Sequence, residues 1–370
     1  MSKGDTGRVI TVDGPIDPKE VGITSSHEHL FIDAVDAWFD PPESAHERAV
    51  ASEPIQLDNL WYVRRHPMGH EDNLRLDSMA EAIDELSYFM RNGGDTVVDV
   101  TPKNLGCDPQ RVRGIARETG LNVVHGTAYY TQPAHPERFS SLDPAELTER
   151  LEAEFVSDVR EGIGDTDVRA GIVGEIGLSD RIYPDEEAVL RAGARAARRT
   201  GASLTVHPPG RTKRSQKGRT KPTSRWGLDV LDIVEEEGLA PERVVVDHMD
   251  RTMFEDLDYQ RELAERGAYL EYDLWGMDAY LEAHDDAYPS DSWRLDSVTE
   301  LIEDGYASNL LFAHDVYLKM QRRAYGGFGY GHVLENVVPM LRARGVEQST
   351  IDRILVDNPQ EMLTFVEPEA

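Results

Sequence analysis

Short apolar runs rich in β-branched residues recur along the chain, and stretches with helical spacing separate them. Typical runs occupy residues 97–100, 171–174, 204–206 and 244–246. Such runs, bounded by turn residues, predict buried strands. Their alternation with amphipathic helices predicts repeated βα units and a parallel sheet.

Eight strands of this kind are expected, which predicts an α/β fold of the (β/α)₈ TIM-barrel type. The expected ranges are 23–29, 95–100, 122–125, 169–175, 203–207, 243–248, 268–273 and 309–313. A short β-hairpin is expected before the first strand, at 8–16, and helices are expected after the last. Because no low-complexity linker divides the chain, we expect a single domain over residues 1–370.

Helical spacing of apolar residues predicts helices at 74–91, 185–199 and 227–237. Residues 31–72 instead form a long stretch rich in Asp, Glu, Pro, His and Trp. A stretch of this length is too long for an ordinary loop. We expect an irregular excursion over the mouth of the barrel.

The first expected strand carries two histidines, His27 and His29, separated by one residue. Side chains alternate along a strand, so both imidazoles leave the same face and Glu28 leaves the other. Neutral imidazole is the commonest side-chain metal ligand. The pair alone also fits two solvated or hydrogen-bonded histidines.

Later strands end in residues of the same chemical kind, and these favour a metal centre. The candidates are Glu175, His207, His248 and Asp315. In a (β/α)₈ barrel the active site lies at the carboxyl ends of the strands. Four imidazoles and two carboxylates are too many for one tetrahedral ion and suit two divalent ions about 3.5–4 Å apart.

The expected centre assigns each residue a role. Glu175 bridges the ions, His27 and His29 with Asp315 complete one ion, and the two later histidines complete the other. A hydroxide shared by the ions is the expected nucleophile, because metal binding lowers the pKa of water to about 7. Asp315 is the expected catalytic residue, which takes the proton and passes it to the leaving group.

Several sequence motifs resemble the phosphotriesterase family of the amidohydrolase superfamily. They include Gly-Ile-Thr-Ser-Ser-His-Glu-His-Leu at 22–30, Gly-Glu-Ile-Gly at 174–177, Val-Val-Val-Asp-His-Met-Asp-Arg at 244–251 and Gly-Gly-Phe-Gly-Tyr at 326–330. Many members bridge the metals with a carboxylated lysine where this chain has Glu175. That feature resembles the phosphotriesterase-related branch and puts efficient organophosphate hydrolysis in doubt.

The resemblance implies a metal-dependent hydrolase with two divalent ions. Zinc is the expected metal, with manganese, cobalt and iron as alternatives, because mixed nitrogen and oxygen ligands accept several ions. A lactone or carboxyl ester is the first expected substrate, an amide the second and a phosphotriester the third. The alternative from another class is a metal-stabilised binding protein without turnover.

The net charge of −30 arises from 69 acids and 39 bases spread along the chain. Such a surface argues against nucleic acid and anionic membranes as partners. High salt screens the self-repulsion of a large net charge, which favours a salt-adapted organism. The first residues lack the apolar stretch of a signal peptide, so a cytoplasmic location is expected.

One segment departs from this acidity, because residues 211–225 carry seven bases and no acid. We expect Lys213 and Arg214 in this segment to attract an anionic small-molecule substrate. A solvated loop paired with nearby acids is the alternative. The family resemblance favours Tyr130 as a further substrate contact and allows a homodimer. Asp273, at the end of the seventh expected strand, is expected to orient substrate or to support a ligand.

Overall fold

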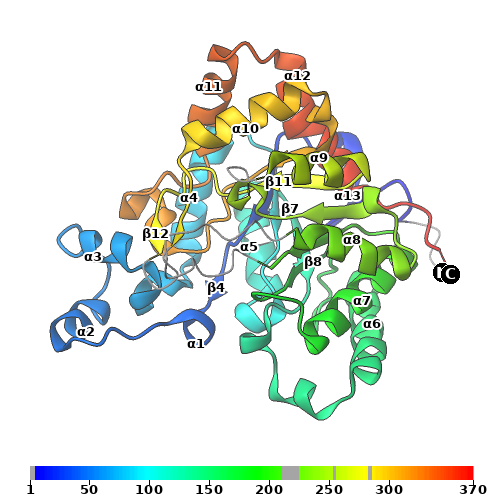
Figure 1. The fold of residues 1–370 in the computed structure, drawn as a ribbon, viewed down its shortest axis with the longest axis horizontal. Helices are drawn as coiled ribbons and strands as arrows, with labels where there is room; N and C mark the ends of the chain where they lie inside the picture. The colour runs from blue at the N-terminus through cyan, green and yellow to red at the C-terminus, as the bar shows by residue number, and fades with distance from the viewer. Residues whose placement is uncertain (1–4, 210–224, 253–255, 282–285, 370) are drawn as a thin grey trace.

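Eight parallel strands form a nearly closed barrel in the computed structural model, which describes residues 5–209, 225–252, 256–281 and 286–369. Each strand pairs with the next one along the chain, and helices lie between them on the outside (Figure 1). The predicted (β/α)₈ barrel is therefore confirmed. The strands are β3 (Thr24–Glu28), β6 (Thr96–Asp99), β7 (Asn122–Thr127), β8 (Ile172–Gly177), β9 (Leu204–His207), β10 (Val244–Val246), β11 (Tyr269–Tyr272) and β14 (Leu310–Phe312).

The first and last strands meet without a regular ladder. Ser26 Oγ donates to the Phe312 carbonyl at 3.2 Å, and the backbone N–H of Asp315 donates to the His27 carbonyl at 3.2 Å. These bonds close the barrel between β3 and β14. They also fix the segment after β14 against the strand that carries both early histidines.

The strand expected at 169–175 is shifted in the structure. Arg169 lies before the strand, where its Nε donates to the Val159 carbonyl at 2.8 Å and its guanidinium pairs with Asp5. Pairing with β7 begins at Ile172, and β8 continues two residues beyond Glu175. Glu175 therefore lies inside its strand and not at its end.

The helix expected at 74–91 starts later than predicted. Residues 75–76 form strand β5 (Arg75–Leu76), which pairs with β4 (Ile32–Asp33). Helix α4 (Met79–Arg91) begins after Ser78, whose Oγ accepts from the Glu81 N–H at 3.3 Å. This N-cap explains the start, because it satisfies a backbone donor that the helix itself cannot.

The remaining long helices surround the barrel, and those expected at 185–199 and 227–237 are present within one residue at each end. They are α5 (Pro109–Thr119), α6 (Pro144–Arg160), α7 (Pro184–Thr200), α8 (Trp226–Glu236), α9 (Leu257–Glu265) and α10 (Asp291–Glu303). The C-terminal helices are α11 (Val338–Ala343), α12 (Gln348–Asp352) and α13 (Asn358–Leu363). Across the described residues, no helix combines the length and the apolar character that crossing a membrane requires.

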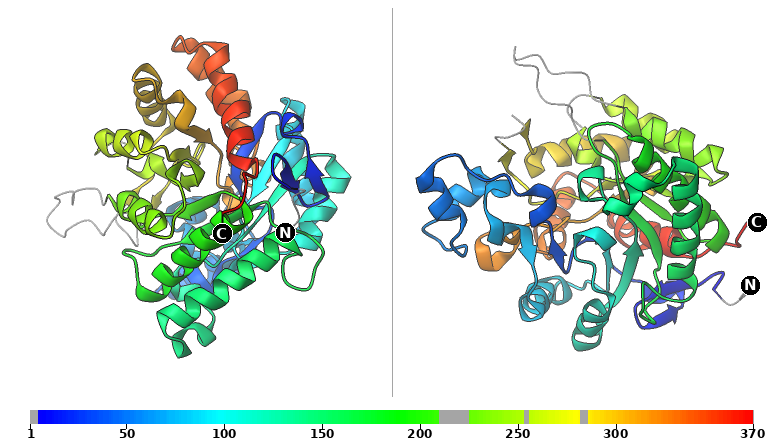
Figure 2. Two further views of the ribbon diagram at one scale, coloured as in Figure 1. Left: turned by 90° about the vertical axis from the view of Figure 1, so that its right-hand side faces the viewer. Right: turned by 90° about the horizontal axis from the view of Figure 1, so that it is seen from below.

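The predicted hairpin consists of β1 (Val9–Thr11) and β2 (Gly14–Ile16). In the turn that connects these two strands, the Val12 N–H donates to the Val123 carbonyl of β7 at 2.9 Å. The Gly7 N–H donates to the Phe365 carbonyl at 2.8 Å, so the two ends of the described chain lie side by side (Figure 2).

The sequence predicted an irregular excursion at 31–72. That prediction is wrong, because the segment contains three short α-helices. These are α1 (Val35–Trp38), α2 (Ala45–Ala51) and α3 (Leu60–Arg65), which lie at the opposite end of the molecule from the termini (Figures 1 and 2). Leu60 and Val63 share a buried apolar cluster with Met277 and Leu318, which follow β11 and β14. The excursion therefore packs on the loops at the carboxyl ends of the strands.

Candidate metal centre

Six side chains predicted from the sequence converge inside the carboxyl end of the barrel. β3 contains the first histidine and the second directly follows it, while β8 contains the glutamate. The other three lie at the end of β9 or shortly after β10 and β14. None has more than 14% of its side chain exposed. The six are His27, His29, Glu175, His207, His248 and Asp315.

One half of the cluster surrounds one oxygen of Glu175, Oε2, and one oxygen of Asp315, Oδ1. His27 Nε2 lies 3.8 Å from Glu175 Oε2 and 3.8 Å from Asp315 Oδ1. His29 Nε2 lies 3.9 Å from the same Glu175 oxygen and 3.2 Å from the same Asp315 oxygen. These four side chains come from three regions that are distant in sequence, at β3, in β8 and after β14, and they face one point.

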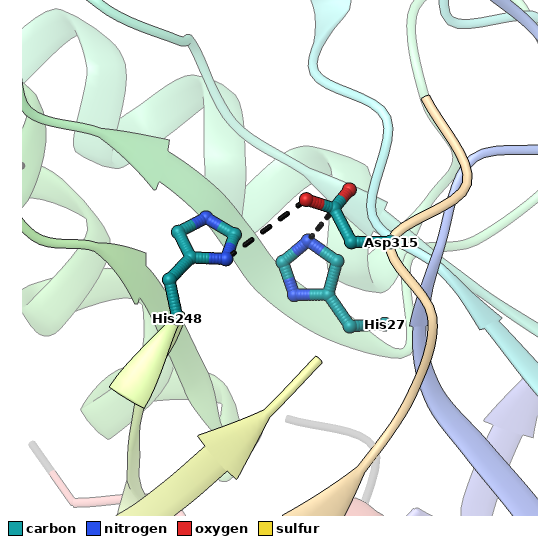
Figure 3. Close-up of side chains that lie close together, drawn as sticks. All are labelled: His27, His248 and Asp315. Atoms are coloured by element: carbon teal, nitrogen blue, oxygen red, sulfur yellow. Dashed lines mark ion pairs between the residues drawn. The ribbon is translucent and has the colours of Figure 1, made fainter. Parts of the chain in front are cut away.

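The other half uses the second oxygen of Glu175. His207 Nδ1 lies 3.0 Å from Glu175 Oε1, and His248 Nε2 lies 3.3 Å from it. The two imidazole nitrogens are 2.6 Å apart. Asp315 Oδ2 also lies 3.9 Å from His248 Nδ1, so that this carboxylate contacts the imidazoles of both His27 and His248 (Figure 3). Glu175 therefore offers one oxygen to each set of histidines.

The residues fit a metal ion, as the ring of His27 illustrates. Its Nδ1 lies 3.1 Å from Glu271 Oε2, while its Nε2 is fully buried and has no hydrogen-bond partner. A buried polar atom without a partner is unfavourable, and an ion among these carboxylates would satisfy it. Two sets of ligand atoms that share Glu175 each lie within 4.8 Å of one another, one with both early histidines and one with both later ones.

Two other ligand histidines are also held by their outward nitrogens. His29 Nδ1 lies 2.9 Å from Thr101 Oγ1, and His248 Nδ1 lies 2.9 Å from Asp273 Oδ1. Partners of this kind fix the ring orientation and the tautomer of a metal-binding histidine. Asp273 is fully buried and also accepts from the His248 backbone N–H at 3.0 Å. Of the two roles expected for Asp273, this arrangement favours the support of a ligand.

The carboxylates control the protonation of the centre. Burial alone favours neutral imidazoles, but Glu271 raises the pKa of His27, and Asp273 that of His248, well above the usual value. Burial also opposes ionisation of Glu175, yet hydrogen bonds from His207 and His248 hold its pKa well below the usual value.

His207 behaves differently from the other histidines. Burial lowers its pKa to about 4, and the nearby charges of His248 and Arg251 act in the same direction. It is therefore neutral at pH 7, as a metal ligand must be.

Glu271 was not singled out from the sequence, although a signal was present. It lies in β11, two residues before Asp273, which directly follows the strand, so both carboxylates point into the same face of the barrel. Asp247, directly before His248, joins them, with its Oδ2 3.9 Å from His27 Nδ1. Burial raises the pKa of Asp247 well above the usual value, as does the charge of Glu271.

Glu28 points away from the centre, as alternation predicts, and has a different task. Its Oε1 accepts from Ser25 Oγ at 2.6 Å, from the His314 N–H at 3.0 Å and from His314 Nδ1 at 2.6 Å. Its Oε2 accepts from the Val316 N–H at 3.1 Å. His314 therefore points toward Glu28 and away from the ligands, and this clamp fixes the segment that contains Asp315.

The expected substrate contacts have mixed outcomes. Tyr130 lies beside the centre, with its hydroxyl 3.2 Å from His207 Nδ1 and its ring packed edge-on against Trp38 of α1. Lys213 and Arg214 lie outside the described residues. Arg251, which the sequence did not indicate, lies next to the centre, with its Nη1 3.5 Å from His207 Nε2.

Comparison with known proteins finds relatives over nearly the whole chain. The sequence model of the Phosphotriesterase family matches residues 7–363. N-acetyltaurine hydrolases of Salmo salar and Homo sapiens are each 34% identical over 363 residues, which cover 97% of this chain and 99% of theirs. The N-acetyltaurine hydrolase of Dictyostelium discoideum is 34% identical over 381 residues, with 97% of this chain and 98% of that protein covered.

Solved structures show the same fold. A resiniferatoxin-binding protein from Rhodobacter sphaeroides superposes with a TM-score of 0.89 and 36% identity, over 96% of this chain and 95% of that one. A phosphotriesterase homology protein from Escherichia coli, with phosphate in its active site, gives 0.71 and 27%, over 94% and 100%. A lactonase from Listeria monocytogenes gives 0.74 over 97% and 100%, and at 24% identity it is a likeness of fold alone.

Proposed function

The chain belongs to the phosphotriesterase family, and on that premise we propose that it hydrolyses the amide bond of small N-acyl compounds that carry an anionic group. N-acetyltaurine, an acetyl amide with a sulfonate, is the compound to test first. The relatives that bear its name are 34% identical and align over nearly the full length of both chains. That match supports an amide ahead of the lactone or carboxyl ester expected from the sequence.

The observation that carries the hydrolytic chemistry is the sharing of Glu175 between two sets of ligand atoms. His27, His29 and Asp315 would hold one divalent ion with Glu175, and the two later histidines would hold the other. Two such ions, when bound, supply a nucleophilic hydroxide near neutral pH and polarise the carbonyl oxygen. Zinc is the first candidate, and manganese, cobalt and iron also suit these ligands.

Asp315 is the proposed proton carrier. Burial alone would raise its pKa, but the hydrogen bond from His29 and the charge of His27 lower it, so the side chain is an ionised acceptor at pH 7. It takes the proton of the attacking water and delivers it to the amide nitrogen as the carbon–nitrogen bond breaks. The products are a carboxylate and an amine.

Aromatic side chains line the proposed substrate site. Trp38 packs edge-on against both Tyr130 and Tyr317, with ring centres 5.5 Å apart in each case. Trp38 belongs to the excursion, so this segment brings an apolar wall next to the ligand cluster. Such a wall would exclude water from the scissile bond and hold the acyl group.

The test is a panel of four substrates with the metal-loaded protein in high salt. N-acetyltaurine is compared with N-ethylacetamide, which has the same amide without the sulfonate, and with a neutral lactone and a phosphotriester. The proposal predicts that N-acetyltaurine has the highest kcat/KM, and that Asp315→Asn lowers its kcat by about 10²–10⁴-fold. A higher kcat/KM on the lactone would contradict the amide proposal and support the lactone or carboxyl ester that the sequence predicted.

A second candidate function is ligand binding without turnover. It is suggested by the resiniferatoxin-binding protein of Rhodobacter sphaeroides, which is 36% identical to this chain. It is disfavoured, because all six ligand positions hold competent side chains. The same panel decides between the two. Tight binding of the four compounds with no product from any of them would support the binding protein.

A further inference from the structure

Arg251 lies at the edge of the metal centre because of a tight turn directly after β10. His248 is followed by the 3₁₀ turn η8 (Met249–Arg251), in which the Arg251 N–H donates to the His248 carbonyl at 2.9 Å. The turn directs the partly buried guanidinium toward His207, so that Arg251 Nη1 lies 3.5 Å from His207 Nε2. A cation thus lies next to the outer edge of a ligand histidine.

The contact between these two side chains places two donors together. His207 turns Nδ1 toward Glu175 and His248, so Nδ1 is the atom that would ligate an ion. A neutral imidazole that ligates through Nδ1 carries its proton on Nε2. Guanidinium has only donors, so neither Nε2–H nor Arg251 can accept from the other. An anionic oxygen beside them would accept from both.

The outer edge of His207 is also the accessible side of the cluster. Its side chain is 14% exposed, compared with 8% or less for the other five ligands. Tyr130 and Trp38 pack next to it.

We propose that Arg251, together with the Nε2–H of His207, binds the sulfonate or carboxylate group of the substrate and sets the preference for anionic amides. This inference rests on the proposed amide hydrolase. It assigns anion recognition to a described residue beside the ligands, and does not depend on the basic segment 211–225. Binding of the anion here would hold the amide carbonyl over the ligand cluster, because a short linker joins the two groups.

The experiment compares Arg251→Gln with the wild type and with Arg342→Gln, a control at an exposed position on α11. For N-acetyltaurine, Arg251→Gln should raise KM about 10–100-fold, the effect of losing a charge-assisted hydrogen bond, with little change in kcat. For N-ethylacetamide its kcat/KM should fall much less, because that substrate has no anionic group for Arg251 to bind. Arg251→Lys should recover part of the lost affinity for N-acetyltaurine, because lysine keeps the positive charge but lacks the forked donors of the guanidinium group.

A second measurement is independent of turnover. Calorimetry with 1-propanesulfonate should show binding to the metal-loaded wild type and to Arg342→Gln, and about 10–100-fold weaker binding to Arg251→Gln. Bound metal per chain is measured for each variant. Equal sulfonate binding by wild type and Arg251→Gln would overturn the inference, as would an equal loss of activity on both amides. If the wild type cleaves neither amide, the proposed function fails, and the sulfonate binding still decides the role of Arg251.

Discussion

At the scale of single residues, the orientation of His27 depends on one carboxylate. Glu271 Oε2 faces Nδ1 of His27 at 3.1 Å and so directs Nε2 into the centre. A carboxylate that holds a ligand histidine in this way also raises its basicity. The side chain of Glu271 is only 1% exposed, so this contact lies in the interior of the protein.

The first prediction concerns this support. Glu271→Gln should weaken metal binding about 10–100-fold, because the outward nitrogen of His27 loses its charged partner. Competition with a chelator of known affinity measures the effect. Glu303→Gln, at an exposed position on α10, is the control and should match the wild type. Unchanged affinity in Glu271→Gln would show that the carboxylate does not support the ligand.

The second prediction is that metal binding releases protons from the ligand histidines. Neighbouring carboxylates raise the pKa of His27 and His248 well above the usual value, so both are protonated at pH 7 before metal binds. Ligation requires neutral imidazoles, so metal binding should release protons, and apparent affinity should rise with pH until both groups are deprotonated. His207, with its pKa lowered to about 4, should contribute none at pH 7. Calorimetry in buffers of different ionisation enthalpy counts the protons, and a count of zero would contradict the account.

The sequence was sufficient to predict the six ligand candidates, because each is a metal-binding residue type at or near the end of an apolar run. Their partners were harder to predict. Thr101 carries no pattern that distinguishes it from other polar residues near strand ends. The two-residue spacing of Glu271 from Asp273 places it on the inner face, but its role depends on which strands become neighbours. The position of Arg251 beside the ligands depends on the turn after β10, where His248 adopts a φ of 56°, and the sequence does not predict this turn.

At the scale of elements, the clamp made by Glu28 joins β3 to the segment after β14. One carboxylate accepts from two backbone N–H groups, a ring nitrogen and a hydroxyl, all in the interior. Because no regular ladder joins these strands, the clamp adds to the two hydrogen bonds that connect them. It also fixes the backbone on both sides of Asp315.

The third prediction follows from this clamp. Glu28→Gln should lower the free energy of unfolding by about 1–3 kcal/mol, because an amide cannot accept all four bonds and leaves a buried donor unpaired. Urea unfolding at saturating metal measures the change. Glu303→Gln should stay within about 0.5 kcal/mol of the wild type, as exposed substitutions do. A Glu28→Gln protein as stable as the wild type would rule out the clamp.

Strand order and helix positions could be predicted from the chain because apolar periodicity reports burial directly. Boundaries could not, because pairing between strands sets them: β8 begins where Ile172 meets Gly126, three residues after the predicted start. The helices in 31–72 escaped prediction because they are short. For α3, the packing partners are residues that follow β11 and β14, such as Met277 and Leu318, which are distant in sequence.

At the scale of the whole molecule, a net charge of −30 on 370 residues adds self-repulsion to the folded state. Raising KCl from 0.1 to 1 M shortens the Debye length from about 10 Å to about 3 Å. The fourth prediction is that the Tm rises over this range. Sucrose, which does not screen charge, serves as the control. A Tm that stays constant or falls with salt would contradict adaptation to a saline environment.

The central claim is that two ions in one centre drive hydrolysis of an anionic amide. The most direct test is a titration of metal-free protein with zinc, in which bound metal per chain and the rate of N-acetyltaurine cleavage are measured on the same samples. The account predicts two ions per chain at saturation, with full activity reached only when the second has bound. Full activity at one ion, or no cleavage with two bound, would contradict it.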